Sequence, residues 1–170
     1  MLSPVMSVKD IELPGEALLR RFDRPGPRYT SYPTADRFVE AFDAAAFAAR
    51  LASRGDQASP PPLSIYVHVP FCDKVCFYCA CNKVVTRHHE RAAEYLEALQ
   101  TEADLVGGLL TGPRELEQLH FGGGTPTFLS NAELEQVMAM LTERYPLAKN
   151  AECSIEVDPR STPPDKVRTL

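Results

Sequence analysis

Four of the five cysteines in this chain of 170 residues lie between positions 72 and 81. Cys72, Cys76 and Cys79 have the spacing C-x3-C-x2-C, which lets three thiolates on one loop converge on a compact metal centre. Three thiolates on a 4Fe–4S cluster leave one iron without a protein ligand and open to a small molecule. We therefore interpret these three cysteines as candidate ligands of an iron–sulfur cluster.

Two other interpretations of the cysteines stay open, a zinc site and a chance grouping. Structural zinc usually takes two separated C-x2-C pairs, and this chain has no second pair. Disulfides are disfavoured because the N-terminus shows no secretory signal, so we expect a reducing cytosol. The spacing assigns no role to Cys81. Cys153 stands alone in an expected strand and is predicted to be a small buried residue.

A glycine run, Gly122-Gly123-Gly124, follows the second expected strand. Glycines expose backbone N–H groups and let a ligand approach closely, as at anion-binding turns, although a plain tight turn would also explain them. The run and the cysteines both follow the C-terminal ends of neighbouring expected strands. In barrel folds such ends open onto one ligand-binding face. We therefore expect one site that contains both motifs.

Strands and helices alternate after residue 62, which predicts a parallel sheet in a doubly wound or barrel-like α/β fold. A capping box of Ser130 and Glu133 marks the start of one helix. A last helix is expected with Thr162 as its cap and Pro163 at its first position. The expected strands are 63–69, 116–121 and 153–157, and the longer helices are 89–110 and 131–145.

Each expected strand has one apolar and one polar face. Val67 opposes Tyr66 and His68 in the first strand, and the other two strands alternate in the same way. Parallel sheets covered on both faces normally read apolar on both. The polar face therefore predicts a barrel-like interior that holds a ligand, with a strand half-exposed to solvent as the alternative.

The N-terminal segment is predicted to be an irregular arm followed by a helix over 38–54 and a proline linker. We place a domain boundary there, with an arm and helix at 1–62 and the main fold at 63–170. A solvated surface is the usual interpretation of a charge run such as the arm's. The arginines of the arm are Arg20, Arg21, Arg24, Arg28 and Arg37.

Composition excludes several classes of protein. The chain is 44% hydrophobic and 24% charged, unlike disordered or collagen-like sequences. Its apolar runs are far shorter than the roughly 20 residues of a membrane span. A net charge of −5 means that the chain lacks the excess of positive charge that is typical of nucleic-acid-binding proteins. We expect a cytoplasmic monomer without nucleic-acid or membrane partners.

The motifs resemble those of a known family. The cysteine triplet is similar to the cluster motif of the radical S-adenosylmethionine (SAM) enzymes, and the glycine run resembles their site for the methionine part of SAM. Further segments, in the right order, resemble the oxygen-independent coproporphyrinogen III oxidase family. They are GPRYTSYPT at 26–34, YVHVPFC at 66–72, CACNK at 79–83 and ECSIEVDPR at 152–160.

This resemblance implies a partial parallel (β/α) barrel of radical SAM type. Such barrels need about 200 residues or more, so the chain is expected to hold only the first three β/α units. Whether it is active alone stays open. The implied activity, in haem biosynthesis, is oxidative decarboxylation of two propionates of coproporphyrinogen III to vinyl groups, giving protoporphyrinogen IX. The resemblance also implies an electron donor. A haem-binding or haem-transfer protein of the same fold is the alternative.

The resemblance also assigns residues to cofactors. Cys72, Cys76 and Cys79 match the cluster ligands, and the free iron would chelate the amino and carboxylate groups of SAM. The positions that match contacts to this first SAM are Tyr66, Gly123 and Glu156. Those near a second SAM are Tyr78, Gly124 and Thr125.

Two further residues are singled out by the resemblance or by the substrate. Cys81 matches an extra cysteine of the true oxidases, whose chaperone-like relatives carry an aromatic residue there. The four propionates of coproporphyrinogen III need cationic donors, and arginine gives bidentate, always-charged ones. We therefore expect the N-terminal arm to fold over the barrel mouth, with Arg28 facing the substrate.

Overall fold

The computed structural model describes residues 15–23 and 34–170, and the chain divides into two compact units, Met1–Phe42 and Asp43–Leu170. The described part of the first unit contains the short helix α1 (Glu16–Phe22) and the 3-10 turn η2 (Ala35–Arg37). Arg28 lies outside the described residues, so its expected role stays a prediction. The domain boundary expected near residue 62 also stays a prediction.

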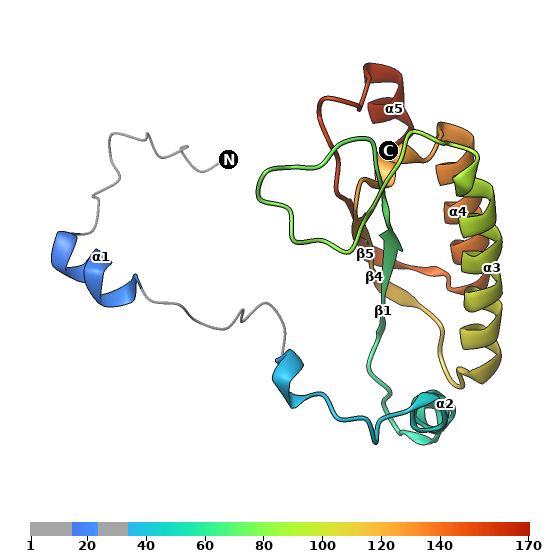
Figure 1. The fold of residues 1–170 in the computed structure, drawn as a ribbon. Coiled ribbons are helices and arrows are strands. Elements are labelled where there is room, and N and C mark those ends of the chain that lie inside the picture. The colour runs from blue at the N-terminus through green and yellow to red at the C-terminus, as the bar shows by residue number, and fades with distance from the viewer. Residues whose placement is uncertain (1–14, 24–33) are drawn as a thin grey trace, which may run out of the picture. The chain divides into compact units, whose positions relative to one another are not determined.

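The second unit is built on a three-stranded parallel sheet with the strand order β1-β4-β5 (Figure 1). The strands are β1 (Leu63–Val69), β4 (Leu116–Gly123) and β5 (Leu147–Ile155). The parallel sheet is confirmed, and β1 has its predicted bounds. The bounds predicted for the third strand were wrong, because β5 begins at Leu147. Its first half is a mostly exposed edge strand whose polar residues give no apolar period.

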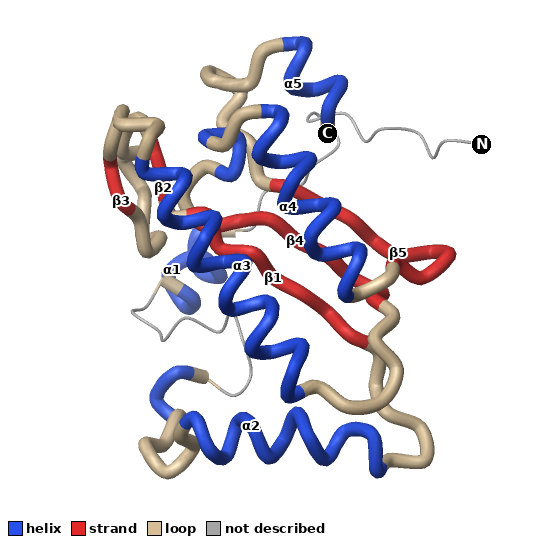
Figure 2. Tube along the Cα trace, turned by 90° about the vertical axis from the view of Figure 1, so that its right-hand side faces the viewer, coloured by secondary structure: helices blue, strands red, loops and turns tan. Residues whose placement is uncertain are grey.

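Two helices cover one face of this sheet, α3 (Arg91–Leu109) and α4 (Asn131–Arg144) (Figure 2). The predicted capping box of α4 is confirmed, since Glu133 N–H donates to Ser130 Oγ over 3.3 Å and Ser130 N–H donates to Glu133 Oε2 over 2.7 Å. The core lies between sheet and helices. Its buried side chains include Val67, Val69, Leu119, Phe121, Ala92, Ala103, Leu134, Val137 and Leu141.

The opposite face of the sheet is polar, as predicted. The strand register places Tyr66 beside His120, and His120 beside Ser154. The rings of Tyr66 and His120 stack with centroids 5.7 Å apart. His120 Nδ1 and Ser154 Oγ are hydrogen-bonded over 2.7 Å. A continuous row of polar groups therefore crosses all three strands.

Two predicted helix starts were wrong because a different residue caps each helix. α2 (Ala44–Ala52) begins after Asp43, whose Oδ1 accepts from Ala46 N–H over 2.9 Å, so residues 38–43 are not helical. α5 (Pro164–Thr169) has Pro163 at its N-cap. Thr162 donates its hydroxyl to the carbonyl of Asp158 over 2.8 Å, where it closes the preceding turn.

A third correction concerns Cys153, which is exposed. It lies on the face of β5 beside Leu119. β5 is the edge strand of the described sheet, so this end of the apolar face is only partly covered. No helix within residues 15–23 or 34–170 is long and apolar enough to cross a membrane.

The buried Arg54 attaches α2 to the rest of the second unit. Arg54 lies in the 3-10 turn η3 (Ser53–Asp56) and donates to the carbonyls of Pro61 over 2.6 Å, Thr111 over 3.4 Å and Pro113. Because Thr111 and Pro113 precede β4, this contact fixes α2 at the N-terminal ends of the strands. The cysteines lie beyond the opposite ends.

Candidate functional site

The cysteines occupy a loop that is closed at its base by two very short parallel strands, β2 (Phe71–Cys72) and β3 (Val84–Val85). Val84 N–H donates to the carbonyl of Pro70 over 2.8 Å, and Thr86 N–H donates to the carbonyl of Cys72 over 2.9 Å. We call residues 72–83 the cysteine loop. Its two ends are held together directly after β1.

Exposure differs along the cysteine motif: Cys72 is buried, Cys76 and Cys79 are half-buried, and Cys81 is exposed. Cys79 N–H donates to the carbonyl of Cys76 over 3.1 Å, which turns the loop between them. Within the part of the chain that the structure describes, no three His, Cys, Asp or Glu side chains form a group that could hold a metal ion. The structure therefore places the three cysteines on one closed loop without gathering their sulfurs.

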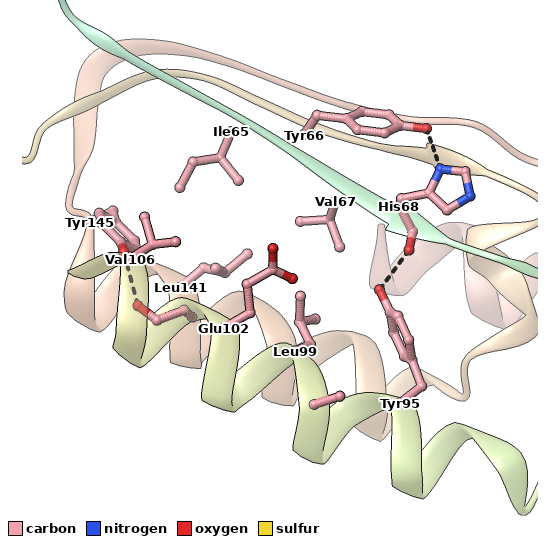
Figure 3. Close-up of a pocket in the computed structure, with 12 residues that line it drawn as sticks. Ile65, Tyr66, Val67, His68, Tyr95, Leu99, Glu102, Val106, Leu141 and Tyr145 are labelled. Carbon is pink, nitrogen blue, oxygen red and sulfur yellow. Dashed lines mark hydrogen bonds between the residues drawn. The ribbon is translucent and has the colours of Figure 1, made fainter. Parts of the chain in front are cut away.

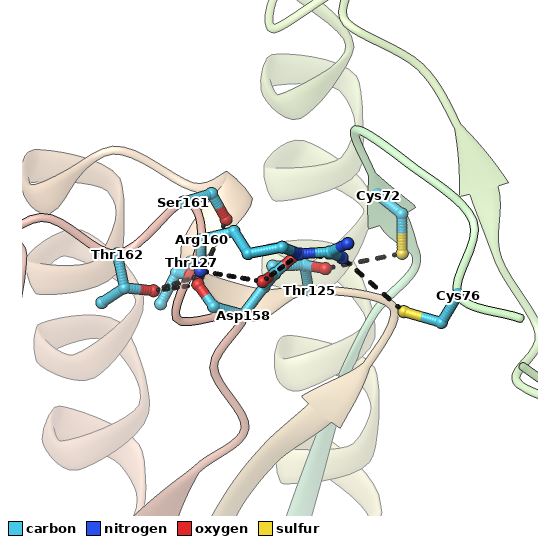
Figure 4. Close-up of polar contacts among 8 residues, drawn as sticks. All are labelled: Cys72, Cys76, Thr125, Thr127, Asp158, Arg160, Ser161 and Thr162. Atoms are coloured by element: carbon cyan, nitrogen blue, oxygen red, sulfur yellow. Dashed lines mark hydrogen bonds and ion pairs between the residues drawn. The ribbon is translucent and has the colours of Figure 1, made fainter. Parts of the chain in front are cut away.

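Two sulfur atoms of the motif accept hydrogen bonds from residues that follow the neighbouring strands. Thr125 Oγ1, after β4, donates to Cys72 Sγ over 3.5 Å, and Arg160 Nη2, after β5, donates to Cys76 Sγ over 3.8 Å (Figure 4). The C-terminal ends of all three strands thus meet at the cysteine loop. The residue that follows the glycine run and the first cysteine are therefore in contact, and the expectation that the two motifs form one ligand site stays a prediction. In the sequence, Arg160 stands out only as part of the segment at 152–160. Its contact with Cys76 depends on how the chain folds.

The pKa values of the Cys79 and Cys81 thiols are shifted in opposite directions from that of an ordinary cysteine. A hydrogen bond from the backbone of Cys81, helped by the ammonium group of Lys83, lowers the pKa of Cys79. Partial desolvation, followed by the negative charges of Cys79 and Glu156, raises the pKa of Cys81. Cys79 is the more acidic thiol of the pair.

The donor set fits a thiolate-bound iron–sulfur cluster. Cys72, Cys76 and Cys79 supply three sulfurs from one loop, and thiolates are the ligands that such clusters use. Donors from Thr125 and Arg160 point at two of the sulfurs, as groups that stabilise negatively charged sulfur would.

The N–H groups of Gly123 and Gly124 are not free, which corrects the expectation of an anion-binding turn at these two residues. Gly123 N–H donates to Glu156 Oε2 over 3.2 Å, and Gly124 N–H donates to the carbonyl of Val69 over 2.8 Å. The missing side chains of these glycines instead allow the end of β4 to lie close to the end of β1. Gly123 has a φ of +112°, and a Cβ on Gly124 would lie 2.6 Å from the carbonyl oxygen of Pro70.

Glu156 links the glycine run to the polar face. Besides the bond from Gly123, its Oε1 lies 3.7 Å from His120 Nε2. Desolvation raises the pKa of Tyr66, with smaller contributions from the charges of Glu156 and Cys81. Tyr66, Gly123 and Glu156, three of the expected SAM residues, therefore lie in one neighbourhood.

His68 belongs to the site and was missed as a functional residue. Its Nε2 lies 2.9 Å from the carbonyl oxygen of Asn82, in the cysteine loop, and its Nδ1 lies 3.0 Å from the hydroxyl of Tyr66 (Figure 3). A carbonyl only accepts, so Nε2 carries the proton and, in the neutral ring, Nδ1 accepts from Tyr66. The sequence signals were its place on the polar face and within the segment YVHVPFC at 66–72.

Tyr78 is not packed with the other expected SAM residues. It lies in the cysteine loop and is 90% exposed, and Phe77 beside it is fully exposed. The structure therefore brings together Tyr66, Gly123 and Glu156 on one side and Thr125 with Cys72 on the other, and leaves Tyr78 in solvent.

A cavity of about 320 Å³ lies elsewhere, between β1 and helices α3 and α4 (Figure 3). Its lining includes Ile65, Leu99, Glu102 and Tyr145, and it contains none of the cysteines or glycines of the site. The hydroxyl of Tyr95 closes one end by donating to the carbonyl of His68 over 2.9 Å, and burial raises the pKa of Tyr95 to about 12. This cavity lies under the helices, and Tyr66 and His68 of β1 also line it.

No family model matches the chain. Individual proteins do match, and several of them are named oxygen-independent coproporphyrinogen III oxidase. The protein from Escherichia coli is 46% identical over 155 residues, which are 91% of this chain and 33% of that protein. The protein from Helicobacter pylori is 38% identical over 151 residues, 88% of this chain and 33% of its own length. The chain thus spans about a third of these relatives.

Two further matches concern a shorter relative and a solved structure. A protein of the same name from Mannheimia haemolytica is 43% identical over 143 residues, which are 84% of this chain and 94% of that protein. The solved structure of coproporphyrinogen III oxidase from Escherichia coli, described as a radical SAM enzyme, superimposes with a TM-score of 0.77 at 42% identity. It is matched over 91% of this chain and 33% of its own.

These matches confirm the predicted partial α/β fold of radical SAM type. These two relatives are similar over 91% and 84% of this chain. The chain belongs to the oxygen-independent coproporphyrinogen III oxidase family.

Proposed function

We propose that this chain forms the cluster- and SAM-binding part of an enzyme that oxidatively decarboxylates coproporphyrinogen III to protoporphyrinogen IX. The observation that carries the proposal is the meeting of three strand ends at the cysteine loop, where Thr125 contacts Cys72 and Arg160 contacts Cys76. Ligands of parallel α/β folds bind at the carboxyl ends of the strands. Cys72, Cys76 and Cys79 would hold a 4Fe–4S cluster there.

When bound, the cluster supplies the electron that cleaves SAM. The residues of this chain bind and orient the two groups. The cysteine loop is anchored at its base by β2 and β3, so the thiolates are held at a fixed place beside the sheet. The hydroxyl of Thr125 and the guanidinium of Arg160 donate to sulfur and favour its negative charge.

SAM would lie against Tyr66, Gly123 and Glu156. The side chain of Glu156 is 55% exposed, so its carboxylate keeps acceptor capacity for the ammonium or hydroxyl groups of a ligand. The absence of a side chain at Gly123 keeps the end of β4 close to β1 and leaves the polar face open. Tyr66 offers a hydroxyl and a ring face at the same edge.

A second SAM would contact Tyr78, Gly124 and Thr125. Tyr78 is exposed, so a ligand over the cysteine loop would cover its ring. The substrate and the electron donor would approach the same open face. The expectation that Arg28 faces a propionate of the substrate belongs to this proposal.

The experiment is anaerobic reconstitution of the chain with ferrous iron and sulfide, followed by equilibrium dialysis against SAM. Because the chain spans a third of its longer relatives, cluster content and SAM binding are measured rather than decarboxylation. We expect about four irons per chain and SAM binding that the metal-free chain lacks. A parallel haem titration tests the alternative function. Stoichiometric haem binding by a chain that takes up no iron–sulfur cluster would contradict the proposal.

A further inference from the structure

Arg160 donates a hydrogen bond to a sulfur of the cysteine motif, and a carboxylate holds its guanidinium. Its Nε donates to Asp158 Oδ1 over 2.9 Å and its Nη2 donates to Asp158 Oδ2 over 2.7 Å, a bidentate pair. The same Nη2 reaches Cys76 Sγ over 3.8 Å (Figure 4). One guanidinium therefore bridges the turn after β5 and the cysteine loop after β1.

The turn that carries Arg160 is itself fixed. The backbone N–H of Arg160 donates to Asp158 Oδ1 over 3.0 Å. The carbonyl of Asp158 accepts from Ser161 N–H over 3.0 Å and from the Thr162 hydroxyl over 2.8 Å. Arg160 and the two residues that follow it, Ser161 and Thr162, are thus tied to Asp158, so the turn that carries the guanidinium is held in place.

The ion pair of Arg160 and Asp158 contributes little to the stability of the fold. The side chain of Arg160 is 58% exposed, and ion pairs with exposed partners contribute about 0–1 kcal/mol. The charge of Lys74, in the cysteine loop, also acts on Asp158 and, after the bonds from Arg160, lowers the pKa of its carboxyl. The charge of Asp158 is thus stabilised mainly by Arg160, the residue that also contacts Cys76.

We propose, on the basis of the function proposed above, that Arg160 is a positioning residue for the cluster, and that its guanidinium, held by Asp158, raises the reduction potential of the cluster through Cys76 Sγ. Hydrogen bonds to the sulfurs and nearby charges set the potentials of such clusters. One-electron reduction by a low-potential donor adds negative charge to the cluster. A fixed cation a few ångströms away stabilises the reduced form more than the oxidised form.

The test compares the reconstituted wild-type chain with Arg160→Gln and Arg160→Lys. Arg50→Gln is the matched control, because exposed Arg50 on α2 lies at the opposite end of the strands and the charge change is the same. The readouts are iron per chain and the midpoint potential from an anaerobic titration followed by electron paramagnetic resonance. Circular dichroism checks that each variant is folded.

We expect Arg160→Gln to keep its iron. At a fixed potential its ratio of reduced to oxidised cluster should be about tenfold lower than in the wild type. For one electron this corresponds to a midpoint potential that is lower by about 59 mV. Arg160→Lys retains the charge and recovers most of the difference, and Arg50→Gln equals the wild type. Equal potentials in all four proteins would overturn this inference and leave the proposed function standing. Unfolding of both Arg160 variants would also overturn it, because the residue would then be structural. A wild-type chain that takes up no cluster would overturn the proposed function and this inference with it.

Discussion

His68 on β1 donates its Nε2 proton to the carbonyl of Asn82, 2.9 Å away, and so joins the sheet directly to the returning limb of the cysteine loop. The hydroxyl of Tyr66 donates to the other ring nitrogen over 3.0 Å and fixes the ring. The loop is therefore held twice, at its base by β2 and β3 and near its end by His68. This second anchor places Cys79 and Cys81 beside the polar face.

Loss of this anchor should loosen the cysteine loop without unfolding the sheet. In His68→Ala, backbone amides of residues 73–83 should exchange about two- to tenfold faster, because a hydrogen bond of about 0.5–1.5 kcal/mol is lost. Hydrogen exchange read by mass spectrometry on the metal-free chain measures this. His88→Ala is the control, since exposed His88 pairs with Glu90 outside the loop. Unchanged exchange in residues 73–83 would show that the imidazole does not hold the loop.

The glycine run should tolerate no side chain at its centre. Gly123→Ala places a Cβ 2.8 Å from the ring of His68 at a φ of +112°, so we expect a loss of about 1–3 kcal/mol in unfolding free energy. Gly108→Ala is the matched control. Gly108 lies in α3 with open space around it, and the change should stabilise the chain by about 0.4–1 kcal/mol. Urea unfolding of both variants checks the pair, and equal stabilities would refute the argument from close packing.

How much of this site could be predicted depends on whether a contact is local. The capping box of Ser130 and the alternation of β1 are short-range patterns, and both are confirmed as structural elements. The cysteine spacing is also a short-range pattern, and the cluster that it indicates stays a prediction. The contacts of Arg160 with Cys76 and of His68 with Asn82 depend on which strand ends meet, which no local pattern encodes.

The errors have a similar cause. β5 was expected too short because its first residues, from Leu147, are polar and lie at an edge where packing selects for no period. The N–H groups of the glycine run were expected to face a ligand, but Val69 and Glu156 accept from Gly124 and Gly123 once β1 and β4 pair. Sequence patterns describe single elements well and do not tell which neighbour satisfies an exposed backbone group.

The capping box of α4 should contribute measurably to stability. Ser130→Ala removes the oxygen that accepts from Glu133 N–H, and replacing such a cap costs about 0.5–2 kcal/mol. Thermal and urea unfolding at neutral pH measure the loss. Ser59→Ala, at an exposed position in the linker before β1, should leave stability within about 0.5 kcal/mol of the wild type. A Ser130→Ala chain as stable as that control would show that the cap is dispensable.

The contact between α3 and α4 should depend on pH through Asp104. A hydrogen bond from Gln100, followed by one from Arg144 over 2.7 Å, lowers the pKa of this carboxyl. A pKa lowered on folding gives stability that is present above the unfolded pKa of about 3.9 and is lost as pH falls through the folded pKa.

Asp104→Asn should therefore unfold at a lower temperature than the wild type at pH 7, and the difference should shrink as the pH is lowered below 4. Melting temperatures of both chains across this range measure it. A difference that stays constant from pH 7 down to pH 3 would mean that the charge of Asp104 is not involved.

The central claim is that Cys72, Cys76 and Cys79, and not Cys81, hold a 4Fe–4S cluster. The most direct test is iron and sulfide content with a Mössbauer spectrum, measured after anaerobic reconstitution of the wild-type chain and of single Cys→Ala variants. Cys153→Ala serves as the control, since Cys153 is exposed on β5 away from the loop. The account predicts about four irons per chain for the wild type, Cys81→Ala and Cys153→Ala, and almost none for the other three variants. It is contradicted if Cys81→Ala loses its iron as completely as those three, or if the wild-type chain binds zinc in place of a cluster.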